Sequence, residues 1–220
     1  MITFDWLSNN YIEVFGTITG IVYVFLEIRQ TIWLWPVGII TSAVYIWVFF
    51  TSKFYADMSL QGYYLVISCL GWYWWAGRKN GSKEDGEKGE KGEKGRNEDE
   101  AKSTLQVTRL KFRTGIILGV VFILLYALMW LILSRLTDSP VPGWDSFLTS
   151  LSIVATWMLA RKIYEHWFLW IVVNTVSFII YFTKGLYPTV VLYFIYAVMS
   201  FIGLKAWKKT FSDNIVSQSL

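Results

Sequence analysis

Residues that build stable catalytic or metal sites are scarce in this chain. Of its 220 residues, one is a cysteine and one is a histidine. The lone Cys69 excludes an intrachain disulfide and a cluster of metal-binding thiolates, and the lone His166 lacks a second histidine for a metal site. No Gly-rich phosphate loop or set of catalytic residues is present. We therefore expect a protein that is not an enzyme and has no cofactor or metal.

Charged residues are also sparse, and they avoid the apolar parts of the sequence. They make up 16% of the chain, against roughly 25% in soluble domains, whereas 55% of the residues are hydrophobic and 19% are aromatic. The hydrophobic residues form long blocks, not the short periodic stripes of half-buried helices. No Lys or Arg precedes the first block, so a cleavable signal peptide is not expected there. This composition indicates an integral membrane protein.

Crossing a bilayer takes about 20 residues at about 1.5 Å each, and seven apolar blocks are candidates for this, several of them near the short limit. We expect these spans at residues 11–28, 33–51, 58–76, 115–134, 145–160, 166–183 and 188–205. Seventeen of the twenty Lys and Arg residues fall on one side of this arrangement. Because positive loops stay in the cytoplasm, we predict an outer N-terminus and a cytoplasmic C-terminus. These charges are mixed with acids or lie at span ends, so no nucleic-acid binding is expected.

The second half of the sequence repeats the first at one fixed spacing, which equals the distance along the chain from Arg29 to Arg161. We call this spacing the repeat offset. Without a gap, this repeat offset also aligns Trp35 with Trp167, Phe50 with Phe182, Thr51 with Thr183, Tyr55 with Tyr187, Tyr64 with Tyr196, Ser68 with Ser200, Gly71 with Gly203 and Trp75 with Trp207. Each copy holds three spans, and the span between them gives both copies the same orientation. Parallel repeats of this kind occur in transporters, with the substrate site between the halves.

The fold class expected is thus an all-α integral membrane protein with seven transmembrane helices in a 3+1+3 order. The expected parts are a first repeat (1–76), a charged cytoplasmic loop (77–113), a linker helix (114–135), a second repeat (144–209) and a tail (210–220). The loop contains "GEKGEKGEKG", which is too charged to bury a core and is expected to be flexible. The stretch "GWYWWAG" directly before it is typical of aromatic anchors at a membrane interface.

Two amides lie inside predicted spans, Gln61 in the third and Asn174 in the sixth. Burying an amide without a partner costs roughly 2–7 kcal/mol, so each needs an explanation. Trp167, Trp170 and Asn174 are spaced by three and four residues and share one helical face. Two indoles beside an amide suit a flat, polar aromatic ligand. The alternative is that both amides bond to neighbouring helices.

Charged side chains are missing from the middle of every predicted span. Nothing there would neutralise a phosphate, and Glu13 and Glu27 lie near span ends, so no intramembrane proton relay is apparent. Aromatic rings attract cations by roughly 0.5–2 kcal/mol. We therefore expect an uncharged or monocationic cargo and a uniporter instead of a pump. A retinal pigment would need a lysine in the middle of the last span, whereas Lys205 lies at its end.

Two stretches carry a family resemblance: "WLWPVGIITSAVYIWVFFTSKFYADMSLQGYYLVISCLGWYWW" and "WFLWIVVNTVSFIIYFTKGLYPTVVLYFIYAVMSFIGLKAW". They resemble the bacterial nicotinamide riboside transporters of the PnuC type, above all in the "WxxWxxxN" of the sixth span and the "LQxxY" of the third. The resemblance implies a SWEET-like fold, homotrimers, and facilitated diffusion of nicotinamide riboside, a vitamin B3 form and NAD precursor, across the inner membrane. It also implies trapping of the cargo by a cytoplasmic kinase.

The resemblance further implies substrate contacts with Trp167, Trp170 and Asn174, and hydrogen bonds from Gln61, Tyr64 and Tyr196. Candidate gate residues are Glu27 and Arg29 on the inner side and Lys53 and Asp57 on the outer side, although surface pairing or topology signals would also explain them. Gly38 and Ser42 stand where the second copy has Trp170 and Asn174, so the site is expected to be asymmetric. A related carrier of thiamine or riboflavin, or a receptor or scaffold that binds without transporting, are the alternatives.

Overall fold

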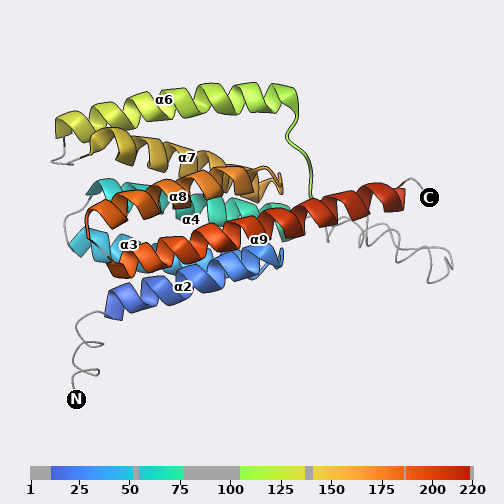
Figure 1. The fold of residues 1–220 in the computed structure, drawn as a ribbon, viewed down its shortest axis with the longest axis horizontal. Helices are drawn as coiled ribbons and strands as arrows, with labels where there is room; N and C mark the ends of the chain where they lie inside the picture. Colours follow the sequence, from blue (N-terminus) through green and yellow to red (C-terminus); the bar gives the residue numbers. More distant parts are fainter. Residues whose placement is uncertain (1–10, 52–54, 77–104, 137–140, 186, 219–220) are drawn as a thin grey trace, which may run out of the picture. The chain divides into compact units, whose positions relative to one another are not determined.

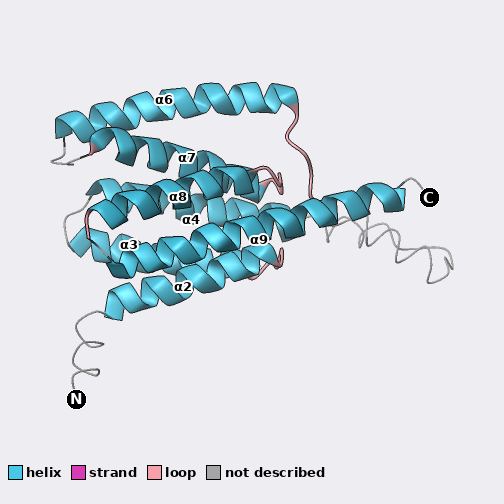
Figure 2. Ribbon diagram, in the orientation of Figure 1, coloured by secondary structure: helices cyan, strands magenta, loops and turns pink. Residues whose placement is uncertain are grey.

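The computed structural model describes residues 11–51, 55–76, 105–136, 141–185 and 187–218. These residues form seven helices, whose course is drawn in Figures 1 and 2. The helices are α2 (Tyr11–Ile28), α3 (Leu34–Thr51), α4 (Tyr55–Ala76), α6 (Phe112–Leu136), α7 (Pro142–Ala160), α8 (His166–Thr183) and α9 (Tyr187–Gln218). The all-α prediction is confirmed for the described part of the chain, where the one β-type pairing is an isolated bridge between Thr108 and Ile163.

Six of the seven helices begin and end within three residues of the predicted spans, whereas α9 runs to Gln218, well past the predicted end at residue 205. The lysines at 205, 208 and 209 end the apolar block but not the helix, because Lys and Ala are good helix formers and no Gly or Pro follows Gly203 before the end of α9. By length and composition, four helices are able to cross a membrane: α3, α6, α8 and α9.

The described residues up to Leu105 form one compact unit, in which α2 packs on α3 and α3 packs on α4. The centre of the α3–α4 contact is Trp35, which is fully buried. Its ring lies against Gly71, where a Cβ atom would collide with it, and meets the Trp75 ring edge-on at 5.3 Å between centroids. Glycine at position 71 is therefore required by the close approach of the two helices.

The described residues from Gln106 onward form the second unit, in which α6 packs on α7, α7 on α8, and α8 on α9. Val154, Met158 and Ile163 form a buried cluster, covered by side chains of α6 and α8. The α8–α9 contact repeats the arrangement of the first unit. Trp167 is buried against Gly203 and meets the Trp207 ring edge-on at 6.0 Å.

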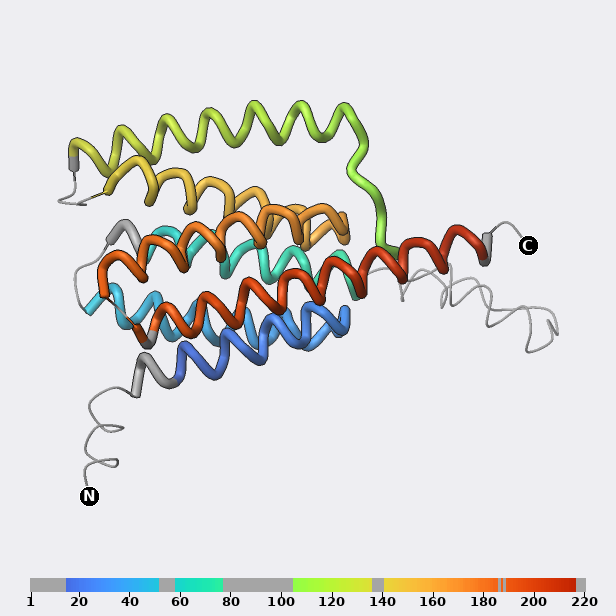
Figure 3. Tube along the Cα trace, in the orientation of Figure 1, coloured from blue at the N-terminus to red at the C-terminus, as the bar shows by residue number. Residues whose placement is uncertain are grey.

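A short segment before α6, residues 106–111, crosses the turn between α7 and α8, and we call it the strap (Figure 3). Thr108 N–H donates to the Lys162 carbonyl at 2.9 Å, and Tyr164 N–H donates back to the Thr108 carbonyl at 3.1 Å. Leu110 N–H donates to Oε2 of Glu165 at 2.9 Å. Because backbone groups make most of these bonds, the strap attaches the start of α6 to this turn without a particular side-chain sequence.

The helix bounds of the two units match at the repeat offset, the step from Arg29 to Arg161. The ends of α2 and α7, both bounds of α3 and α8, and the starts of α4 and α9 are all separated by this same step. Among described residues other than glycine, positive φ angles occur at Gln30 (55°) and Lys162 (52°), again one repeat offset apart. The turn after α2 and the turn after α7 therefore have the same left-handed residue at the same place.

Candidate functional site

The candidate site in the second unit follows one face of α8 and one face of α9. The α8 face carries Trp167, Trp170, Asn174, Ser177 and Tyr181, and the α9 face carries Tyr193, Tyr196, Ser200, Gly203 and Trp207. Every step along both faces is three or four residues, so each set lies on one side of its helix. Since α8 packs directly on α9, we call this contact the α8–α9 seam.

The end of the seam nearest the α7–α8 turn is closed by packed rings. Trp167 is 1% exposed and lies between Gly203, Trp207 and His166, whose ring centroid is 4.8 Å away. His166 is itself fully buried, and its Nδ1 lies 2.7 Å from the Ile163 carbonyl. These contacts hold the Trp167 ring in one orientation.

Two indole N–H groups on this face are buried and unused. The Nε1 atoms of Trp167 and Trp170 have no hydrogen-bond partner among the described residues. A buried donor without a partner costs roughly 1–3 kcal/mol, which a ligand that accepts a hydrogen bond would recover. Trp35, the counterpart of Trp167 in the first unit, has the same unpartnered Nε1.

Asn174 lies in the middle of the seam and is 7% exposed. Its Nδ2 donates to Oγ of Ser200 at 3.0 Å, and that hydroxyl donates to the Tyr196 carbonyl at 2.8 Å. The amide thus joins α8 to α9, as the alternative from the sequence expected. Its Oδ1 takes part in none of the hydrogen bonds found in the described residues, so it remains available to accept one from a ligand.

Gln61 and Tyr64 lie on α4 in the first unit, where both are partly buried. The Tyr64 ring lies 5.6 Å from that of Tyr63. One repeat offset before Trp170 and Asn174, the first unit has Gly38 and Ser42. A Cβ at Gly38 would lie 2.9 Å from Oγ of Ser68. The first unit therefore has no room at this point for a side chain as large as Trp170.

The candidate gate residues differ in how they are placed. Glu27 is 2% exposed and interacts electrostatically with Tyr23, so it is no surface charge. Arg29 is exposed, with its guanidinium 4.7 Å from the centre of the Phe25 ring. Lys53 lies outside the described residues, and for Asp57 the structure describes the helical backbone alone.

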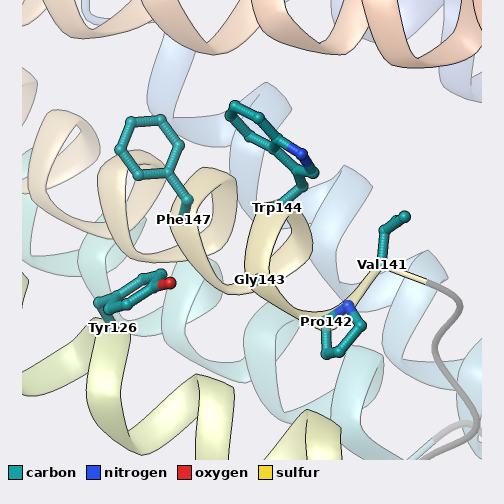
Figure 4. A pocket seen from close by; sticks show the side chains of 6 residues that line it. All are labelled: Tyr126, Val141, Pro142, Gly143, Trp144 and Phe147. Carbon is teal, nitrogen blue, oxygen red and sulfur yellow. The ribbon is translucent and has the colours of Figure 1, made fainter.

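A separate open cavity of about 330 Å³ lies between α6 and the start of α7 (Figure 4). It is lined by Tyr126, Val141, Pro142, Gly143, Trp144 and Phe147. None of the residues predicted to bind substrate lines it, and no charged side chain does. For metals, the described residues contain no group of three His, Cys, Asp or Glu side chains that could hold an ion.

Sequence reasoning did not select Asp145, Tyr181 and Tyr193, which lie at the opposite end of the seam from Trp167. The Tyr181 and Tyr193 rings stack with their centroids 5.2 Å apart, and Asp145 lies in the first turn of α7, which packs on α8. Asp145 comes at the start of a predicted span, where an acid is unremarkable, and tyrosines are common in this chain. The signal that could have identified them is the spacing, since Tyr181 continues the Trp167–Trp170–Asn174 face and Tyr193 precedes Tyr196 by three residues.

Comparisons with known proteins agree with this fold. Residues 10–209 match a family model described as nicotinamide mononucleotide transporter. The nicotinamide riboside transporter PnuC of Escherichia coli is 26% identical over 208 residues, covering 90% of this chain and 85% of the relative. The riboflavin/roseoflavin transporter RibM of Streptomyces davaonensis is 24% identical over 213 residues, covering 92% of each.

Among solved structures, a crystal structure of the vitamin B3 transporter PnuC matches with a TM-score of 0.68 and 22% identity, covering 96% of this chain and 86% of that one. At this identity the likeness concerns the fold. The family model, in contrast, spans nearly all of the sequence, from the start of α2 into the second half of α9. The chain is a multi-pass membrane protein that belongs to the nicotinamide mononucleotide transporter family.

Proposed function

We propose that this protein carries nicotinamide riboside across the membrane by facilitated diffusion. The observation that carries this proposal is the α8–α9 seam, where Trp167 and Trp170 have buried indole N–H groups with no partner among the described residues. On the same α8 face, Oδ1 of Asn174 takes part in none of the hydrogen bonds found there. A carboxamide on a flat ring can accept from an indole and donate to an amide oxygen, which is the complementary pattern. The E. coli relative, PnuC, is named for the same cargo.

The riboside fits this chain better than the mononucleotide for which the family is named. Lys and Arg occur in the described helices only at Arg113, at Arg135 and in α9 from Lys205 onward. A phosphate that crosses a low-dielectric bundle needs a cationic partner, because burying an unpaired charge is prohibitively costly. The riboside carries one positive charge and no phosphate, so aromatic rings suffice to accompany it.

A riboflavin carrier is the second candidate, because RibM matches the chain over nearly its whole length. Like the riboside, riboflavin is flat and can exchange hydrogen bonds with an amide. Unlike the riboside, it carries no charge. A thiamine carrier of the same architecture remains the third. A receptor or scaffold would bind one of these molecules without moving it.

We further propose a 3+1+3 arrangement of parallel repeats, with α6 as the linker between α2–α4 and α7–α9. The support is the repeat offset shared by helix bounds, by the two left-handed residues and by the two Trp–Gly–Trp contacts. The charge distribution supports an outer N-terminus and a cytoplasmic C-terminus in the bacterial inner membrane. In the second unit, the residues proposed to contact the substrate are Trp167, Trp170, Asn174 and Tyr196. In the first unit, Gln61 and Tyr64 stay predicted substrate residues.

Assembly and coupling belong to the same proposal. We expect a homotrimer, and a cytoplasmic kinase that phosphorylates the riboside and so keeps it from leaving. Such trapping would allow accumulation without an ion gradient. It agrees with the position of Glu27 near the end of α2, since an acid there offers no relay through the middle of the membrane.

Uptake of labelled nicotinamide riboside into liposomes that contain the purified protein tests this function. We expect equilibration without a riboside kinase inside and accumulation with one, and competition by unlabelled riboside but not by the mononucleotide, thiamine or riboflavin. Binding without uptake would favour the receptor or scaffold. Competition by riboflavin or thiamine alone would move the cargo to that vitamin.

A further inference from the structure

Three helices place one acid and three tyrosines at the same end of the second unit. Asp145 lies in the first turn of α7, Tyr181 in the last turn of α8, and Tyr193 in the second turn of α9, followed by Tyr196. Because α7 packs on α8 and α8 on α9, these ends lie together. The charge distribution predicts that this is the outer end.

The rings in this cluster are in contact. Tyr181 and Tyr193 stack with centroids 5.2 Å apart and an angle of 24° between their planes. Tyr196 meets Tyr193 edge-on at 6.0 Å and 86°. Asp145, in the first turn of α7, lies across the α7–α8 contact from the last turn of α8, which holds Tyr181. All four side chains are partly exposed, so a ligand can reach the cluster without unfolding it.

The combination of groups suits a cation. The faces of aromatic rings attract positive charge, and a carboxylate beside them adds an attraction that acts over a longer range. An acid in the first turn of a helix is also favourable for the helix dipole. That role, however, would be served by Asp145 alone and does not require tyrosines from α8 and α9 beside it.

The cluster is continuous with the centre of the seam. From Tyr193 the contact passes to Tyr196, whose carbonyl accepts from Ser200, and the Ser200 hydroxyl accepts from Asn174. A molecule held at the tyrosines therefore lies at one end of a connected row of groups that leads along α9 to the Asn174 amide.

We propose that Asp145, Tyr181 and Tyr193 form an outer subsite that selects a cationic aromatic cargo before it reaches Asn174. The proposal rests on the function proposed above and specifies where the positive charge of the cargo is recognised. Asp145 supplies the charge, and the two stacked tyrosines supply the surface for the flat ring.

Transport of two nearly identical molecules tests this subsite in liposomes. Nicotinamide riboside has a positively charged ring, whereas its dihydro form has the same outline and no charge. For Asp145→Asn we expect KM for the cation to rise about tenfold, as for the loss of one nearby countercharge, with little change in the maximal rate. KM for the dihydro form should stay within twofold of wild type. Asp145→Glu should restore most of the affinity for the cation.

The matched control is Asp213→Asn, which removes the same charge from an exposed position in the last two turns of α9. It should change neither KM. Equal effects of Asp145→Asn on both molecules, or no effect on either, would overturn the subsite while leaving the transporter function intact.

If the wild-type protein transports neither molecule, the proposed function is wrong, but the subsite can still be tested by a binding measurement. The probe is the N-methylnicotinamide cation, with neutral nicotinamide as its comparison, titrated against the tryptophan fluorescence of the purified protein. Wild type should prefer the cation, and Asp145→Asn should lose that preference. A preference that persists in the variant would show that another group recognises the charge.

Discussion

Replacing Gly203 by alanine should push α8 and α9 apart at their closest contact. A Cβ at position 203 would collide with three atoms of the Trp167 ring. That ring cannot turn away, because it is 1% exposed and is held by His166 at 4.8 Å and Trp207 at 6.0 Å between centroids. The α8–α9 backbone or the whole ring cluster has to shift instead.

The expected cost follows from two opposing terms. Overpacking a rigid core costs about 1–3 kcal/mol, and this site belongs at the upper end because the neighbour is a buried ring. Alanine in a helix interior regains up to about 1 kcal/mol relative to glycine. The net loss of stability is about 1–2 kcal/mol, or a fall in Tm of roughly 2–8 °C for a chain of this size.

Thermal unfolding of the purified protein in detergent, followed by size-exclusion chromatography after heating, measures this loss. The matched control is Gly119→Ala in α6, where a Cβ would have no atom within 4 Å and alanine should leave Tm unchanged or raise it. Adding Trp167→Phe, which shortens the ring, should recover part of the loss in Gly203→Ala. If both glycine variants melt alike, the packing argument is refuted.

Three further changes test other parts of the structure. Asn174→Ala should weaken binding of nicotinamide riboside more than tenfold in a titration, and unchanged affinity would exclude Asn174 from the site. The lost hydrogen bond to Ser200 should lower the free energy of unfolding by only about 0.6–2 kcal/mol. Thr108→Pro removes the N–H that donates to the Lys162 carbonyl, so amide exchange at Tyr164 should speed up in hydrogen-exchange mass spectrometry, whereas Thr108→Ala should leave it slow. Burial lowers the pKa of Lys162 from 10.5 to about 8, so between about pH 8 and 10.5 the unfolded chain binds more protons than the folded chain. Stability should therefore rise with pH over this range, and melting of Lys162→Met measured against pH should lack the rise.

The positions of the helices were largely predictable from the sequence, whereas their pairing within each unit came from the structure. Long apolar blocks locate the spans, because a membrane helix needs a set length of apolar residues. The repeat offset aligned Trp35 with Trp167 and Gly71 with Gly203, but the sequence did not predict that these residues touch. The structure places each ring on its glycine.

Contacts between distant segments could not be predicted in the same way. Nothing in the polar run around Thr108 indicates that its backbone pairs with the α7–α8 turn, because backbone bonds leave no side-chain pattern. Asn174 was identified as an amide in need of a partner, but the choice of Ser200 depends on how α8 and α9 are aligned. The Tyr181–Tyr193 stacking, with Asp145 at the same end of the unit, depends on three helix ends meeting, which no local spacing records.

The length of α9 determines how the protein can be handled. Its 32 residues extend about 48 Å at 1.5 Å each, whereas a bilayer core is about 30 Å thick. The helix therefore continues for several turns beyond the hydrocarbon and carries its lysines with it. A fluorescent protein or affinity tag joined by a helical linker directly after Gln218 would stand on a rigid stalk clear of the lipid headgroups. Its orientation could then be set by the number of helical residues added.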